Sequence, residues 1–422
     1  MSPKLQPVRG THDLLPQEAA RYRAVESEMA RACRNYGYGE IMTPVFEFSE
    51  VFHRTLGDTS DVVSKETYTF EDRGGESLTL RPEFTASIVR ALISNSLTQE
   101  LPQKWYYAGP AFRYERPQKG RMRQFHQFGA ECIGVAEPIA DVEMIAMADQ
   151  CLATLGLKDH IRLELNSLGD TESRASYRNA LVAYFSDHKN SLSDDSKTRL
   201  EKNPLRILDS KDEDDKKLIA DAPSAADYFT EEAKAFFEYV TTSLDALGIA
   251  YTLNPRLVRG LDYYNHTVFE FVTDALGAQG TVLAGGRYDG LVKTMGGPDI
   301  PGIGFASGIE RLMALTEATI KDSPTFYYPK SPIVIIPVDS AQEMEAVKLA
   351  QELRREFVVE LVTRGNMGKK MKRAEKAGAS AVLILGDSEV ANAEVSVKVL
   401  ADGRQEQVKR DELSAWLTQQ KL

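Results

Sequence analysis

Cysteine, histidine motifs and long apolar runs are scarce in this chain of 422 residues. Its three cysteines, Cys33, Cys132 and Cys151, are widely spaced and odd in number, so we expect neither a disulfide framework nor a CxxC zinc site. The six histidines show no HxxxH or HExxH spacing, and we expect no metal held by protein side chains. No apolar run approaches the roughly 18–20 residues that span a bilayer, and the first ten residues lack a secretory h-region. We therefore expect a cytoplasmic protein with no membrane segment.

The charge balance excludes a general nucleic-acid binder but leaves room for a docked polyanion. The net charge is −11, whereas phosphate neutralisation requires positive charge. Two segments of the chain are nevertheless locally basic. Residues 113–123 carry five basic residues and one acid, a balance of +4, and residues 354–376 carry eight basic and three acidic residues, a balance of +5. Either run alone is explained by a solvated face, and the pair leaves specific binding of a polyanion open.

The first 325 residues read as one α+β catalytic domain with an inserted, mostly helical subdomain at about 170–250. That insertion is polar, with acidic and serine-rich loops between helical patterns such as 231–247. A glycine-rich stretch ends at Gly308. The hydrophobic patterns predict helices at 17–36, from 82 to 93, at 139–156 and from 309, and strands at 41–46, 78–80, 256–272 and 281–284.

A linker at 322–332 precedes a second domain, expected at 331–422. Short apolar strands alternate there with helices, which predicts a small α/β domain. The predicted strands are 333–336, 358–362 and 381–385, and the predicted helices are 341–356 and 368–377.

A hairpin from Lys104 to Ile133, turning at Pro117–Gly120, carries the chemistry that the sequence shows most directly. Residues two apart on a strand share a face. One face therefore collects arginine, glutamate, phenylalanine, glutamine and glycine, which suits neither a core nor open solvent. Arginine suits phosphate, an aromatic ring suits a base, and an amide with a carboxylate suits an amine or an imidazole. We interpret this face as a ligand pocket, against the alternative of a solvated face with internal ion pairs; its residues are Arg113, Glu115, Phe125, Gln127, Gly129 and Glu131.

The motifs resemble those of the class II aminoacyl-tRNA synthetases. Phe112-Arg-x-Glu115 with Arg121-x-Arg-Gln-Phe125 is similar to their second motif, Gly302–Leu312 to the third and Gly39–Pro44 to the first. The segments 257–264 (LVRGLDYY) and 284–290 (AGGRYDG) narrow the resemblance to the histidyl-tRNA synthetase family. The resemblance covers nearly the whole chain and implies an antiparallel-sheet catalytic domain followed by an anticodon-binding domain.

The resemblance implies an ATP site that forms an aminoacyl-adenylate. Arg113 and Arg259 are its expected catalytic residues, on opposite sides of the α-phosphate, and Arg113 also holds the substrate carboxylate. The other ATP contacts are Glu115 for the adenine amino group, Phe125 stacked on adenine, and Arg121 with Arg311 on the β- and γ-phosphates. Mg²⁺ is expected to bridge phosphates and to need no strong protein ligand.

For the amino acid, L-histidine, the resemblance implies a pocket that binds both the α-ammonium and carboxylate groups and the imidazole. The α-ammonium and carboxylate groups are expected to contact Glu83, Thr85 and Gln127, together with Arg113 and Arg259. The imidazole is expected to contact Glu131 and Tyr264, and Tyr263 and Tyr288 are expected to close the pocket. Position 84 departs from the family pattern, since Phe84 stands where most relatives have glycine, and we expect its ring to reshape the pocket wall.

The resemblance also implies macromolecular partners. Gln118 is the expected contact to the acceptor end of the histidine tRNA, and the C-terminal domain, with its basic run, the contact to the anticodon arm. A homodimer is implied through the segment around Pro44. Three other readings stay open: a catalytically inactive paralogue that serves as a regulatory subunit of histidine biosynthesis, a synthetase for another amino acid, and a stand-alone RNA-binding module.

Overall fold

The computed structural model describes residues 5–56, 66–117, 121–210, 212–258, 263–277, 280–319 and 331–422. The chain divides into two compact units, residues 1–326 and 327–422. Across these described ranges, no helix has the length and apolar character needed to cross a membrane.

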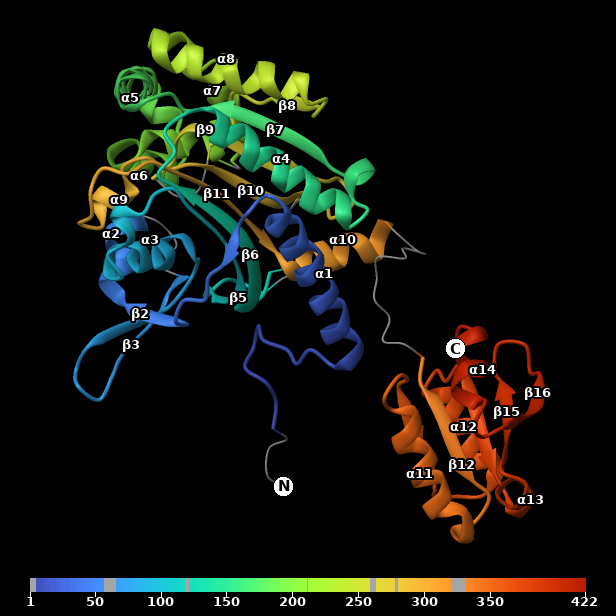
Figure 1. The fold of residues 1–422 in the computed structure, drawn as a ribbon. Helices are drawn as coiled ribbons and strands as arrows, with labels where there is room; N and C mark the ends of the chain where they lie inside the picture. The colour runs from blue at the N-terminus through green and yellow to red at the C-terminus, as the bar shows by residue number, and fades with distance from the viewer. Residues whose placement is uncertain are drawn as a thin grey trace. The chain divides into compact units, whose positions relative to one another are not determined.

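An eight-stranded sheet forms the centre of the first unit (Figure 1). Its inner strands run antiparallel, and the two edge strands, β1 and β8, lie parallel to their neighbours. The spatial order is β1 (Gly39–Glu40), β5 (Gln103–Phe112), β6 (Gln124–Ile133), β11 (Gly302–Gly308), β10 (Thr281–Arg287), β9 (Asn265–Val272), β7 (Arg162–Ser167) and β8 (Tyr251–Leu253). The antiparallel sheet expected from the sequence is confirmed.

One face of this sheet is covered by α1 (Pro16–Asn35), α4 (Ile139–Thr154), α8 (Glu231–Ala246) and α10 (Ile309–Thr319). Alternate residues of β6, among them Phe128 and Cys132, point into the apolar core beneath these helices. All three cysteines are buried as free thiols, and the Sγ atoms of Cys33 and Cys151 lie 3.9 Å apart between α1 and α4.

The other face of the sheet meets α3 (Thr85–Ser94) and α9 (Leu291–Thr294), which share a second apolar core with it. Beside them, α2 (Ser49–Leu56) packs against a small sheet in the order β2 (Phe46–Phe48), β4 (Ser77–Leu80), β3 (Tyr68–Glu71). The segment 170–250 is mostly helical, as expected: α5 (Thr171–Asp187), α6 (Asp194–Lys202) and α7 (Glu213–Ala220) enclose a core of their own, and α8 packs on α4.

Four features of the first unit differ from the sequence predictions. The predicted strand 41–46 is a connection between β1 and β2, and the carbonyls of Thr43 and Pro44 accept hydrogen bonds from Arg81 instead of joining a ladder. The predicted helix start at Pro82 is wrong, because the Glu83 carboxylate accepts the first amide N–H groups of a helix that begins at Thr85. Strand β9 begins at Asn265, and the glycine-rich stretch 302–308 is itself a central strand.

The second unit is a five-stranded mixed sheet with the expected α/β alternation, in the order β13 (Val359–Leu361), β12 (Ile333–Pro337), β14 (Ala381–Leu385), β15 (Glu394–Val399), β16 (Gln405–Lys409). Helix α11 is Glu343–Leu353, shorter than predicted, and α12 is Met367–Lys376. Two antiparallel strands, β15 and β16, and the helices α13 (Asp387–Ala391) and α14 (Leu413–Gln419) complete the unit and were not predicted.

A buried ion pair ties the sheet to its helical cover. The Arg287 guanidinium, at the end of β10, contacts the Asp141 carboxylate of α4, and both side chains are fully buried. Arg287 also donates to the Val135 carbonyl at 3.0 Å and to Asp289 at 3.1 Å. Because Asp289 in turn accepts the Gly302 N–H, this arginine fixes the corner between β10 and β11.

We expect Asp141→Ala to lower the free energy of unfolding by about 3–5 kcal/mol, since the substitution leaves a buried cation without its main partner. Urea unfolding curves of the variant and the original chain measure the difference. Asp299→Ala, which removes only the exposed partner of Lys293, is the control and should leave the curve unchanged. Equal effects of the two substitutions would contradict the weight given to the Arg287 pair.

Candidate active site

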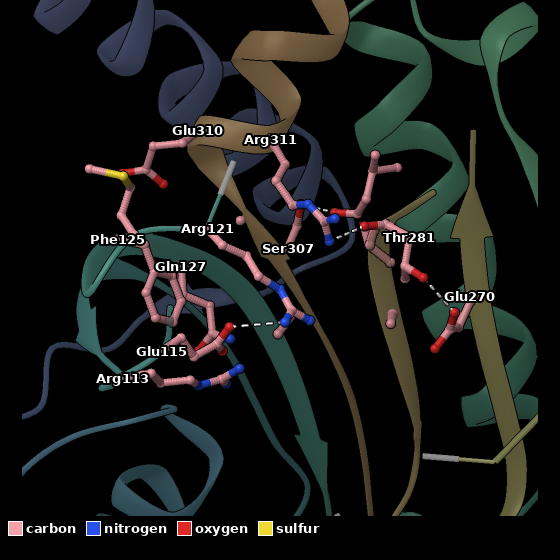
Figure 2. Close-up of a pocket in the computed structure, with 16 residues that line it drawn as sticks. Arg113, Glu115, Arg121, Phe125, Gln127, Glu270, Thr281, Ser307, Glu310 and Arg311 are labelled. Carbon is pink, nitrogen blue, oxygen red and sulfur yellow. Dashed lines mark hydrogen bonds and ion pairs between the residues drawn. The ribbon is translucent and has the colours of Figure 1, made fainter. Parts of the chain in front are cut away.

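A cavity of about 300 Å³ lies on the sheet face that carries α3 (Figure 2). Its floor exists because small residues stand in register across the strands. Gly129 of β6 pairs with Ala306 of β11, Ala306 pairs with Ala284 of β10, and Ala284 pairs with Glu270 of β9. A larger side chain at Ala306 or Ala284 would fill the space that the cavity occupies.

Three arginines bring positive charge to this cavity. Figure 2 shows Arg113 and Arg121 reaching it from the hairpin and Arg311 from the first turn of α10. Arg311 Nη1 donates to the Thr281 carbonyl at 2.5 Å. Burial, and then the nearby Arg121 cation, lower the pKa of Arg311 below its ordinary value. Like charges held this close favour a bound polyanion such as a triphosphate.

An aromatic ring and a carboxylate form the opposite wall. The guanidinium carbon of Arg113 lies 5.2 Å from the centroid of the Phe125 ring, and Arg113 Nε donates to the Pro82 carbonyl at 2.9 Å. Glu115 forms an ion pair with Arg121 at 3.1 Å. This wall offers a planar apolar surface beside hydrogen-bond acceptors, which suits a purine base.

A second, more deeply buried group of polar side chains adjoins the cavity along β6. The Glu131 carboxylate accepts a hydrogen bond from Thr85 Oγ1 on one oxygen and from the Tyr288 hydroxyl on the other, both at 2.7 Å. Glu83 is also buried, and its carboxylate accepts the N–H groups of Thr85 at 2.6 Å and Ala86 at 2.9 Å. Two buried acidic groups, Glu83 just before α3 and Glu131 of β6, therefore lie near enough to interact electrostatically.

Glycine in β11 makes the position of Glu131 possible. Gly304 pairs directly with Glu131, and a Cβ at Gly304 would overlap the Glu131 carboxylate. The pattern Gly302-Ile-Gly304-Phe-Ala306 places the small residues toward the site and the apolar ones, Ile303 and Phe305, into the core. A glycine-rich strand is therefore needed here for space rather than for backbone freedom.

Burial changes the protonation of this pocket. Removal from water raises the pKa of Glu131 from its ordinary 4.5 to about 8, although the bonds from Thr85 and Tyr288 oppose the shift. Burial likewise raises the pKa of Glu83, against its backbone hydrogen bonds. A basic or hydrogen-bonding ligand would compensate the carboxyl groups that water cannot reach.

Three tyrosines pack near these carboxyl groups. The rings of Tyr263 and Tyr264 lie 4.7 Å apart, and Tyr263 meets Tyr288 edge-to-face at 6.0 Å. All three pack in the apolar core between α3 and the sheet. Gln127, between Phe125 and Gly129 on β6, is buried, and its side-chain oxygen has no hydrogen-bond partner within the described structure, so it is open to a ligand donor.

Comparison with known proteins identifies the family of this chain. The family model described as histidyl-tRNA synthetase matches residues 10–312, and the anticodon-binding domain model matches residues 332–420. The chain belongs to the histidyl-tRNA synthetase family. The histidine–tRNA ligase of Rhodospirillum rubrum is 56% identical over 96% of both chains, and that of Gluconobacter oxydans is 55% identical, also over 96% of both. The apo histidyl-tRNA synthetase of S. aureus has a TM-score of 0.82 and 36% identity, covering 98% of this chain and 99% of its own.

The structure of this family member brings together most of the residues that the sequence singled out. The cavity holds Arg113, Glu115, Arg121, Phe125 and Arg311, and Gln127 lies where it meets the buried pocket. That pocket holds the other predicted amino-acid contacts, Glu83, Thr85, Glu131, Tyr263, Tyr264 and Tyr288. Arg259 and Gln118 lie outside the described residues, so their predicted positions stay predictions.

The strand parity predicted for the hairpin is correct. His126 lies on the opposite face from Gln127, where its ring meets Tyr22 and its Nδ1 contacts Glu310 at 2.7 Å. The His126 side chain is therefore packed between α1 and α10. The Phe84 ring stacks on Tyr107 in the apolar core shared by α3 and the sheet, and its expected effect on the pocket wall stays a prediction.

Two acidic residues of the cavity were missed from the sequence. Glu270 faces it from β9 and accepts a hydrogen bond from Thr281 at 2.7 Å, while Glu310 stands at the start of α10. Glu270 interrupts the apolar run Val268–Val272, and a single carboxylate on a buried strand is a signal that could have identified it. Among the described residues, no three histidine, cysteine or acidic side chains gather as a metal site.

The raised pKa of Glu131 makes stability depend on pH. Because the folded chain binds this proton more tightly than the unfolded chain, the stabilisation is complete below about pH 4.5 and is lost as pH rises toward 8. The loss reaches about 1.4 kcal/mol per pH unit within that window. Glu131→Gln removes the titration, and we expect urea unfolding between pH 5.5 and 8.5 to show a smaller pH slope for the variant.

Glu317→Gln, at an exposed position of α10, serves as the matched control and should keep the original slope. If Glu131→Gln also keeps that slope, Glu131 is ionised in the folded chain at neutral pH and the assignment is wrong.

Proposed function

We propose that this chain is a histidine–tRNA ligase. It activates L-histidine with ATP, releases pyrophosphate, and transfers histidine to the 3′ end of the histidine tRNA. The observation that carries the proposal is the continuity of two sites along one face of the hairpin: an arginine-rich cavity with an aromatic wall, and beside it a buried pocket of two carboxyl groups.

The first site suits ATP. Arg121 and Arg311 would hold the β- and γ-phosphates, because charge-assisted bonds from a planar guanidinium match phosphate oxygens. Phe125 would stack on adenine, and Glu115 would accept a hydrogen bond from the adenine amino group. Arg113, at the end nearer Gln127, would contact both the α-phosphate and the carboxylate of the amino acid.

The second site suits histidine. Glu83, Thr85 and Gln127 would bind the α-ammonium and carboxylate groups, and Glu131 with Tyr264 would bind the two imidazole nitrogens. Imidazole has one donor and one acceptor nitrogen when neutral, so a carboxyl group and a hydroxyl satisfy both. Tyr263 and Tyr288 would enclose the ring, and Tyr288 already holds Glu131 in place.

The reaction needs positioning and charge more than covalent chemistry. An oxygen of the histidine carboxylate attacks the α-phosphorus, a P–O bond forms, and the bond to the leaving pyrophosphate breaks with its electron pair. A terminal ribose hydroxyl of the tRNA then attacks the carbonyl carbon, and AMP leaves. Arginines on both sides of the α-phosphate would stabilise the charge that develops; Arg113 would be one, and Arg259 is proposed as the other from the resemblance alone.

Mg²⁺ would neutralise part of the phosphate charge when bound. Its oxygen preference is compatible with the Glu270 carboxylate, which lines the cavity, but Glu115 is paired with Arg121 and Glu310 with His126. The phosphates themselves would therefore supply most of its ligands.

The C-terminal unit would bind the anticodon arm of the tRNA. Its basic run is exposed at Arg354, Arg364, Lys369 and Arg373, as phosphate contacts require. Lys370 of the same run is not available, because its buried Nζ donates to the Pro337 carbonyl at 2.6 Å. Gln118 is proposed as an acceptor-end contact, and the cytoplasm as the location, from the sequence.

A regulatory paralogue is the second candidate, since it would share the fold and the histidine pocket. The retained arginines at the cavity, Arg113, Arg121 and Arg311, favour the ligase, because a histidine sensor has no use for a triphosphate site. The C-terminal unit points the same way.

ATP–pyrophosphate exchange, measured with each amino acid in turn, tests the ligase against the regulatory paralogue and against a synthetase for another amino acid. We expect exchange with histidine alone. Arg113→Ala should lower the rate by about 10²–10³-fold, the cost of removing one preorganised transition-state donor. Arg116→Ala, at an exposed neighbour that does not line the cavity, should stay near the original rate. Exchange without histidine, or none at all, would overturn the proposal.

We also propose that the chain forms a homodimer through the small sheet β2–β4–β3. Phe46, Phe48 and Phe70 are 52%, 57% and 46% exposed. Register places Phe48, Leu78 and Phe70 in one row and Phe46, Leu80 and Tyr68 in the next, so one sheet face is apolar and largely uncovered. A second copy of the chain is the occupant that the first family motif at 39–44 supports.

Sedimentation at micromolar concentration tests the dimer. We expect the original chain to sediment as a dimer and Phe48→Asp to sediment as a monomer, because a carboxylate in a closed apolar interface costs several kcal/mol. Leu253→Asp, at an exposed apolar residue of edge strand β8, is the control and should leave the dimer intact. A dimer that survives Phe48→Asp would place the interface elsewhere.

A further inference from the structure

The N-terminal segment 8–11 lies against the base of the hairpin that carries the cavity arginines. The segment is a turn, closed by hydrogen bonds from its last residue to the carbonyl of its first, at 2.9 Å from the amide and 2.8 Å from the hydroxyl. Within this turn, the Gly10 carbonyl accepts the N–H of Arg123 at 2.7 Å. The Arg123 carbonyl accepts the N–H of Arg113 at 2.9 Å. Backbone hydrogen bonds therefore link the segment 8–11 to a residue that lines the cavity.

The Arg123 side chain occupies the space beside Gly10. A Cβ added to Gly10 would lie 2.7 Å from Arg123 Cγ and 2.9 Å from Cδ, closer than real Cβ atoms come to their neighbours. The backbone of Gly10 also has a φ of 87°, in the left-handed region that L side chains disfavour. Position 10 therefore requires glycine both for the turn and for the contact with the stem of Arg123.

The far end of the Arg123 side chain supports the opposite strand of the hairpin. Its guanidinium carbon lies 3.8 Å from the centroid of the Tyr114 ring, and its Nε donates to the Glu115 carbonyl at 3.2 Å. The N–H of Tyr114 donates to the Glu66 carbonyl at 2.7 Å, which holds the same strand from outside. Arg123 is not among the described residues that line the cavity. It contacts instead the backbone that carries the cavity residue Glu115.

We propose that the segment 8–11 clamps this hairpin, and that Gly10 and Arg123 are positioning residues for the binding of ATP. This inference rests on the proposed function. Residues 113–123 carry a charge balance of +4, so mutual repulsion opposes the order of this part of the hairpin when no anion is bound. A clamp at its base offsets that repulsion, and a preorganised site loses less free energy when its ligand binds.

The clamp acts at the ATP end of the site. The residues that it holds, Arg113 and Glu115, line the cavity proposed for ATP, whereas Glu131 of the proposed histidine pocket lies eight residues further along the chain from Arg123. A disturbed clamp should therefore weaken the binding of ATP more than the binding of histidine.

Gly10→Ala places a methyl group against the Arg123 stem and displaces it from Tyr114 and Glu115. In ATP–pyrophosphate exchange we expect the KM for ATP to rise by about 10- to 100-fold, the cost of one weakened hydrogen bond to a charged group, and the KM for histidine to stay within about twofold.

Gly37→Ala is the matched control. Gly37 has a φ of 81°, so the variant carries similar backbone strain, but an added Cβ there meets no described atom within 4 Å. Both KM values should stay at those of the original chain. Thermal melts of the two variants measure the strain separately from the kinetics.

Arg123→Ala tests whether Gly10 acts through the arginine. On its own it removes the support of Tyr114 and Glu115, and we expect a rise in the KM for ATP similar to that of Gly10→Ala. The double variant should resemble Arg123→Ala alone, because the new methyl group then has no Cγ or Cδ to displace. Residues that act through one contact show such non-additivity, whereas independent residues add.

An unchanged KM for ATP in both single variants would overturn the inference. So would equal rises in the KM values for ATP and histidine, which a general disturbance of the site would produce. Full additivity in the double variant would contradict the link between Gly10 and Arg123. None of these results affects the proposed function, which fails only if the original chain shows no histidine-dependent exchange.

Discussion

The site depends above all on the hydrogen bonds that two hydroxyl groups donate to the buried Glu131 carboxylate. Thr85 belongs to the first turn of α3, Glu131 to β6, and Tyr288 to the segment that follows β10. One carboxyl group therefore joins three segments that are far apart in the sequence. The carboxyl group can be buried there only because β11 has glycine at position 304, opposite Glu131. A buried glutamate at position 131 therefore requires glycine at position 304.

The charge of the site changes from basic at its open end to acidic at its closed end. At the open end, Arg113, Arg121 and Arg311 bring like charges close together, and a bound polyanion would reduce their repulsion. At the closed end, the buried acids Glu83 and Glu131 hold protons more tightly than free carboxyl groups do and are relieved by a base. A substrate with a phosphate chain at one end and a basic heterocycle at the other satisfies both. Binding of such a substrate would therefore remove unfavourable electrostatic interactions from the site.

The sequence predicted those parts of the fold that depend on local period. Alternation along 125–132 assigned each side chain of β6 to the correct face, because a strand has a period of two whatever its neighbours are. The sequence predictions failed where tertiary contacts decide which secondary structure forms. Helix α3 starts three residues after Pro82 because the Glu83 carboxylate accepts hydrogen bonds from its first amide N–H groups. Residues 302–308 form a strand although glycine disfavours strands, because neighbouring side chains occupy the space that larger side chains on this strand would need. The stack of Phe84 on Tyr107 could not be predicted either, because it depends on the register of β5 and not on the local sequence.

The burial of every cysteine has a practical consequence for following this protein in solution. Cys33 and Cys151 face each other between α1 and α4, and Cys132 points into the same core. Burial raises the pKa of Cys132, and the hydrogen bond with the Cys33 thiol, followed by burial, raises the pKa of Cys151, so both remain largely unreactive thiols at neutral pH. A cysteine introduced on the surface, for example on the outer face of α8 or of α12, would therefore be the preferred target of a maleimide dye. Single-site fluorescent labelling of the folded chain then requires no prior removal of native thiols.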